Sequence, residues 1–145
     1  MITMNDTHPY IAASLGYFKG IRHWHEFDAF IELLEELNDG SWFIYDTQTE
    51  PPTKPVTKTD FSAFLKQTKQ LLHEQHQEDY CGIVYVDNID KPEYIKIYDP
   101  ANLGVVCGFS DNPPLPGWVV SRLAPCSLHK EKPVSLWKKY LHRFS

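Results

Sequence analysis

The stretch from residue 80 to residue 123 constrains the fold most, because it alternates β-rich runs with turn-forming residues. Residues 80–86 and 93–98 are rich in isoleucine, valine and tyrosine, and the segment between them contains aspartate, asparagine and proline. This pattern is typical of a β-hairpin. A third run, residues 117–123, follows a proline-rich loop that cannot itself be a central strand. The sequence therefore predicts an antiparallel meander.

Along the second run of the hairpin, successive side chains point to opposite faces of the strand. Tyr94, Lys96 and Tyr98 fall on one face, and Ile95 and Ile97 fall on the other. We expect one face of this strand to be buried and the other to be exposed to water.

Two segments before the meander have the periodicity of amphipathic helices. From residue 23 to residue 37 the apolar side chains recur three or four positions apart, and acidic residues occupy the opposite face. Gly40 can then end the helix. A second helix is expected to start at a capping Thr59 or Asp60 and to end near residues 77–79. Between the helices, residues 41–46 predict a short strand at one edge of the sheet.

The chain of 145 residues predicts a single α+β domain. We expect an antiparallel sheet of about four strands with the two main helices packed on one face. Residues 105–108 could add a short strand. Residues 1–22 form an N-terminal arm without a regular period. Residues 130–145 are expected to form a short, basic amphipathic helix that starts near Pro133.

The net charge of −5 is unevenly distributed along the chain. Residues 130–145 contain five basic residues and one acid, which leaves nine basic and 18 acidic residues before them. An acidic body repels phosphates, so we expect no nucleic-acid partner. The basic helix could meet an acidic partner or a membrane surface, but docking on the acidic body of its own chain is favoured.

The composition also indicates where the protein acts. No apolar run approaches the roughly 20 residues that a membrane span needs, and the first residues do not resemble a secretory signal. We expect a cytoplasmic protein. Three widely spaced cysteines without a C-x-x-C motif are expected to be free thiols.

A metal site is one candidate for function. His73 and His76 are three positions apart on the second helix, a spacing that lets both reach one metal ion. A second pair, His23 and His25, flanks Trp24 at the start of the first helix. Cys107, which has glycines nearby on both sides, could add a reactive or metal-binding thiol. Surface histidines and a buried, inert cysteine are the simpler interpretations. The sequence indicates no particular cofactor.

Binding to another protein is the second candidate. Trp118 follows the proline-rich loop and could belong to a partner-binding edge, although a core position is the simpler interpretation. Tyr98 and Asp99 stand where the second run of the hairpin ends, and Asp99 could instead serve its own turn. Catalysis by turn aspartates such as Asp87 and Asp99 stays open, because the sequence does not show which loops converge.

Well-marked catalytic motifs are absent from the sequence. It contains no G-x-G-x-x-G, G-x-x-x-x-G-K-[ST], G-x-S-x-G or H-E-x-x-H. The leading hypothesis is therefore a non-catalytic, protein-binding accessory or regulatory module, with a homo-oligomer also compatible with the sequence. The alternative is a metal- or thiol-dependent site built from Cys107, His73 and His76.

Overall fold

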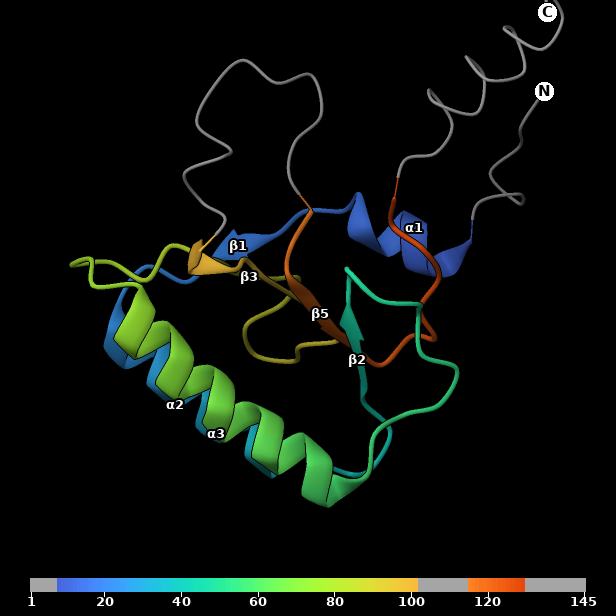
Figure 1. The fold of residues 1–145 in the computed structure, drawn as a ribbon, viewed down its shortest axis with the longest axis horizontal. Helices are drawn as coiled ribbons and strands as arrows, with labels where there is room; N and C mark the ends of the chain where they lie inside the picture. Colours follow the sequence, from blue (N-terminus) through green and yellow to red (C-terminus); the bar gives the residue numbers. More distant parts are fainter. Residues whose placement is uncertain (1–7, 102–114, 130–145) are drawn as a thin grey trace, which may run out of the picture.

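An antiparallel sheet forms the centre of the structure, a computed structural model that describes residues 8–101 and 115–129 (Figure 1). The strands are β1 (Lys19–Gly20), β2 (Phe43–Asp46), β3 (Val84–Val86), β4 (Tyr94–Ile97) and β5 (Trp118–Ser121). They lie in the order β1-β3-β4-β5-β2, and every neighbouring pair is antiparallel. The predicted meander is confirmed as β3-β4-β5, and the predicted edge position of β2 is also confirmed. The fifth strand, β1, was not predicted.

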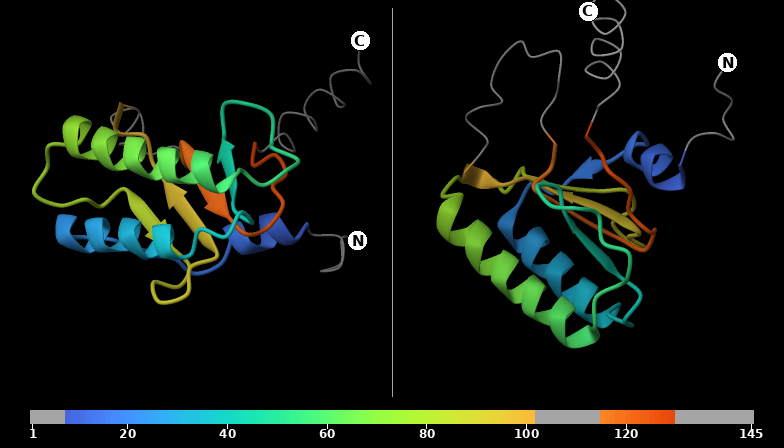
Figure 2. Two further views of the ribbon diagram at one scale, coloured as in Figure 1. Left: turned by 90° about the horizontal axis from the view of Figure 1, so that it is seen from below. Right: turned by 45° about the vertical axis from the view of Figure 1, so that its right-hand side comes forward.

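In the described part of the chain, three helices accompany the sheet: α1 (Pro9–Ser14), α2 (Trp24–Glu36) and α3 (Lys58–Gln75). Figure 2 shows α2 and α3 side by side across one face of the sheet, so the predicted α+β fold is confirmed. The two helices run antiparallel, since the start of α2 meets the end of α3. The predicted short strand at 105–108, Cys107 and the predicted helix in residues 130–145 lie outside the described residues.

Both ends of α3 differ from the ends that the sequence predicted. Thr57, rather than Thr59 or Asp60, caps the helix, and its side chain accepts a hydrogen bond of 3.1 Å from the backbone N–H of Asp60. The N–H groups of a helix's first turn have no acceptor within the helix, and the threonine side chain supplies one. The helix also ends two residues before the predicted range.

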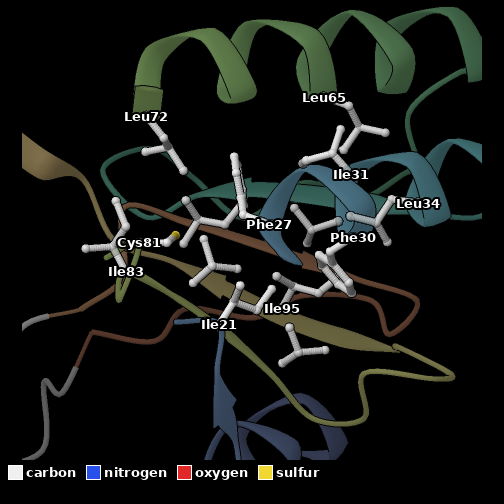
Figure 3. Packing of buried hydrophobic residues seen from close by; sticks show 14 of the residues in the cluster. Ile21, Phe27, Phe30, Ile31, Leu34, Leu65, Leu72, Cys81, Ile83 and Ile95 are labelled. Carbon is white, nitrogen blue, oxygen red and sulfur yellow. The ribbon is translucent and has the colours of Figure 1, made fainter. Parts of the chain in front are cut away.

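The core lies between the helix pair and the sheet (Figure 3). The apolar stripe of α2 points into it as predicted, and Phe27 and Leu34 are almost completely buried. Leu65 and Leu72 reach the same cluster from α3, and Ile95 reaches it from β4. Burial of apolar surface stabilises the fold by roughly 25 cal/mol per Å², so this cluster is the main source of stability.

The opposite face of the sheet is partly covered by α1. Tyr10 of α1 is completely buried against Tyr45, Tyr94 and Val119, which project from three different strands. The prediction that one face of this strand would be exposed to water therefore fails at Tyr94, which is buried although it lies on the face opposite to Ile95 and Ile97. The amphipathic pattern of a six-residue helix is too short to reveal such a covering element from the sequence.

A polar network fixes the end of α2 to the end of β5. The guanidinium of Arg122 lies 4.3 Å from the centre of the Trp42 ring and donates hydrogen bonds to Asp39, Ser41 and the carbonyl of Leu37. Hydrogen bonds from Ser41, followed by Arg122, lower the pKa of Asp39 to about 2. A cation beside the last carbonyls of a helix also interacts favourably with the helix dipole.

Replacing Leu34 by alanine should lower the free energy of unfolding by about 2–5 kcal/mol, because the side chain is 1% exposed in the core. Chemical denaturation would measure the change. Glu32→Ala, at an exposed position on the same helix, is the control and should change stability by less than about 0.5 kcal/mol. Equal stabilities for the two variants would contradict the packing described here.

Candidate functional site

The histidines that the sequence singled out meet at one end of the helix pair. The antiparallel arrangement brings the start of α2 against the end of α3, where aromatic and histidine rings from three segments gather. We call this group the helix-end cluster, and it consists of His23, Trp24, His25, His73, His76 and Tyr80.

Trp24 is the centre of the helix-end cluster. Its ring centroid lies 4.4 Å from that of His73 and 6.0 Å from that of His76. The ring of His23 stacks on that of His25, with 5.5 Å between the ring centroids and 12° between the planes. The Tyr80 ring lies 6.1 Å from that of His23. The rings therefore form two groups, His73 and His76 beside Trp24 and His25 and Tyr80 beside His23, which meet at the adjacent residues His23 and Trp24.

Backbone hydrogen bonds hold this surface in place. The indole Nε1 of Trp24 donates to the carbonyl of Glu78 at 2.9 Å, which ties the segment after α3 to the start of α2. The N–H of Cys81 donates to the carbonyl of Arg22 at 2.7 Å. Tyr80 stands between these two connections and is nevertheless 63% exposed. Its backbone is fixed while its side chain stays available.

Two carboxylates contact histidines of the helix-end cluster. Asp28 Oδ1 lies 2.7 Å from His73 Nε2, and Glu26 Oε1 lies 3.8 Å from His23 Nε2. Glu74, Glu78 and Asp79 are exposed at or just beyond the end of α3. The basic residue Arg22 directly precedes His23 in the chain. The surface therefore combines aromatic rings with an excess of negative charge.

The predicted metal ligands have specific neighbours in the structure. His73 contacts Asp28 and Trp24, whereas His76 is partly buried beside Trp24. Within residues 8–101 and 115–129, no three His, Cys, Asp or Glu side chains are placed to hold one metal ion. Because Cys107 lies outside these residues, the site with Cys107, His73 and His76 stays a prediction.

The remaining predicted binding residues lie near one another where β4 ends and β5 begins. Trp118 is opposite Ile97 in the ladder and packs partly buried against the core. Tyr98 packs edge-on against Tyr85, and burial, followed by this neighbour, raises the pKa of Tyr98. Asp99 accepts a hydrogen bond of 2.9 Å from the N–H of Ala101. Each residue thus has a structural contact, and their role in binding stays a prediction.

The described cysteines and the turn aspartate Asp87 have structural surroundings. Cys81 and Cys126 are free, and burial raises the pKa of both thiols, so neither is activated. Asp87 Oδ1 accepts hydrogen bonds from the N–H groups of Asn88, Glu93 and Tyr94. These three bonds close the β3-β4 turn, which agrees with the interpretation of Asp87 as a turn residue.

A second cluster of titratable side chains lies buried beneath α1. Tyr10, Tyr45 and Tyr94 are at most 1% exposed, and their hydroxyl groups make no hydrogen bond of good geometry with any described residue. Burial is the main cause that raises the pKa of Tyr94 to about 12, and it raises that of Tyr10 further. Burial thus keeps the hydroxyls of Tyr10 and Tyr94 protonated. This cluster holds α1 on the sheet, whereas His23, His25, His73 and Tyr80 of the helix-end cluster are exposed.

Sequence reasoning found only part of the helix-end cluster. It identified both histidine pairs but gave no reason to join them, and it assigned Tyr80 to the start of a strand, whereas β3 begins at Val84. The available signal was local: Trp24 stands between two histidines at the start of α2. Long-range pairing of the helices decided the rest.

Comparison with protein-family models, with curated proteins and with solved structures finds no match for this chain. Among the helices of the described residues, none combines the length and apolar character that crossing a membrane would need. The geometry of the surface is therefore the basis for a functional proposal.

Replacing Tyr94 by phenylalanine should leave stability unchanged or raise it by about 1 kcal/mol. A buried hydroxyl without a partner costs about 1–3 kcal/mol, and phenylalanine keeps the ring. Urea denaturation would measure the effect, with Tyr94→Ala as the control that should lose about 3–5 kcal/mol. A loss above 1 kcal/mol for the phenylalanine variant would mean that the hydroxyl has a partner.

The raised pKa of Tyr94 predicts a specific loss of stability in alkali. The folded pKa is about 12 and the ordinary value is 10.0, so the folded protein holds this proton more tightly than the unfolded chain does. The stabilising contribution is complete below pH 10 and disappears as the pH rises toward 12, by on the order of 2–3 kcal/mol. Free energies of unfolding measured across this range should fall less steeply for Tyr94→Phe. Equal slopes would contradict the assignment.

Proposed function

We propose that this protein is a non-catalytic, protein-binding accessory or regulatory module of the cytoplasm, and that its partner contacts the helix-end cluster. The observation that carries this proposal is the position of Tyr80. Its side chain is 63% exposed beside the stacked rings of His23 and His25, although hydrogen bonds fix the backbone on both sides of it.

Such a surface has the properties of a protein-binding site. Aromatic side chains are enriched in interfaces, where they provide a large contact area with little loss of conformational entropy. The Trp24–Glu78 hydrogen bond holds the segment after α3 in place before a partner arrives, which lowers the cost of association. The partly buried Trp24 with more exposed rings around it also resembles the centre and surroundings of a binding hot spot.

The cytoplasmic part of the proposal is supported by the thiols. Cys81 and Cys126 are both free. Free thiols suit a reducing compartment.

A photo-crosslinking amino acid at position 80, in the full chain and in its native cells, tests the proposal. We expect a defined protein to be captured from position 80. Position 17 is the matched control, because Tyr17 is also an exposed tyrosine, 87% accessible, but lies outside the helix-end cluster. Capture of the same protein at equal yield from both positions, or of none from position 80, would contradict the proposal. Capture of a second copy of this chain would identify a homo-oligomer.

A further inference from the structure

We propose that α1 is a displaceable cover, which lifts from the sheet while the rest of the domain stays folded. Figure 1 shows α1 on the side of the sheet away from α2 and α3, so its departure leaves the core between the sheet and the helix pair intact. Opening exposes an apolar face of the sheet that includes Tyr45, Tyr94 and Val119. The helix is therefore an intramolecular contact that hides a second surface. The helix-end cluster contributes no residue to this surface.

The attachment of α1 to the sheet depends mainly on Tyr10, the one buried residue of this helix. Its ring lies 5.0 Å from that of Tyr94 and 6.4 Å from that of Tyr45, measured between the centroids. Ala13 is partly buried against the same cluster, and Lys96 Nζ donates a hydrogen bond of 2.8 Å to the carbonyl of Ser14. A helix of six residues is too short to be stable by itself, so contacts of this kind determine whether α1 is docked.

The closed position of α1 carries a cost that the open position does not. The hydroxyls of Tyr10, Tyr45 and Tyr94 are buried and make no hydrogen bond of good geometry with a described residue. Such groups destabilise the closed form, because water can bind them once they are exposed. Burial of the Tyr10 ring stabilises the closed form by an amount of the same order. Because the two contributions oppose each other, we expect closure to be favoured by a small margin.

The chain permits this movement because an exposed turn joins α1 to the sheet. Leu15 and Tyr17 are 76% and 87% exposed, and Gly16 lies between them. After the turn, Phe18 is held by Lys96, whose Nζ lies 4.0 Å from the centroid of the ring. Strand β1 then pairs with β3, which fixes the far side of the turn. Residues 15–17 can therefore act as the hinge while β1 stays in the sheet.

Adjacent positions on β5 provide matched probes of the opening. Val119 and Val120 are both completely buried, but Val119 lies in the cluster beneath α1 and Val120 lies in the core on the opposite face. Val119→Cys and Val120→Cys are made in the full chain with Cys107→Ser and Cys126→Ser. The second of these changes is needed because Cys126 packs against the cluster and its modification would disturb α1. Cys81, which is buried in the same core as Val120, is an internal control.

The measurement is the rate of alkylation by iodoacetamide in native buffer, with each modified position identified by peptide mass mapping. The Val119→Cys thiol should react at least about tenfold faster than the Val120→Cys thiol and than Cys81. Its rate should change little in urea below the unfolding transition, because a local opening exposes less surface than global unfolding does. Equal rates at positions 119 and 120, or an equally steep rise of both rates with urea, would overturn the proposal.

Two substitutions test the opposing contributions. Tyr94→Phe removes a hydroxyl without a partner and should slow alkylation of the Val119→Cys thiol about two- to tenfold. Tyr10→Ala removes the anchor of α1 and should speed this alkylation at least about tenfold, while the Val120→Cys thiol stays protected. An unchanged rate in Tyr94→Phe would overturn the proposed cost of closure. Loss of the whole fold in Tyr10→Ala, seen by circular dichroism, would show that α1 cannot leave without unfolding the domain and would overturn the displaceable cover.

Discussion

The packing of α2 against both α3 and the sheet is the interaction on which the rest of the structure depends. Its stripe meets both layers, so Phe27, Ile31 and Leu34 join α3 to β3, β4 and β5 in a single cluster (Figure 3). The acids near its C-terminal end oppose the helix dipole and do not stabilise it. Packing therefore holds this helix, and everything at its two ends takes its position from that packing.

The two ends of α2 have different surroundings. At the C-terminal end, Arg122 connects the carbonyl of Leu37 to Asp39 and stacks on Trp42. At the N-terminal end, His23 caps the helix without a side-chain hydrogen bond, and the rings of the helix-end cluster face outward. A closed network suits stability, whereas an open aromatic surface with fixed backbone suits association. This asymmetry supports the location of the proposed site.

Much of the architecture could be predicted from local patterns. The meander, the edge strand β2 and the inward face of α2 follow from alternation and from helical spacing, and the structure has all three. The misses were short elements without a period. Helix α1 and strand β1 are too brief to produce a pattern, and their positions depend on contacts such as those of Tyr10 with Tyr45 and Tyr94. The cap at Thr57 was missed because nearby residues were equally suitable.

The sequence alone determined the class of fold, the amphipathic faces and the presence of two histidine pairs, because each of these depends on residues that are close together in the chain. It did not determine that the pairs form one surface. His23 and His73 are separated by fifty positions, and only the antiparallel packing of α2 on α3 brings the ring of His73 to that of Trp24, the residue after His23. The tertiary structure decided the candidate site, since a contact between distant segments depends on how whole elements bury their apolar faces.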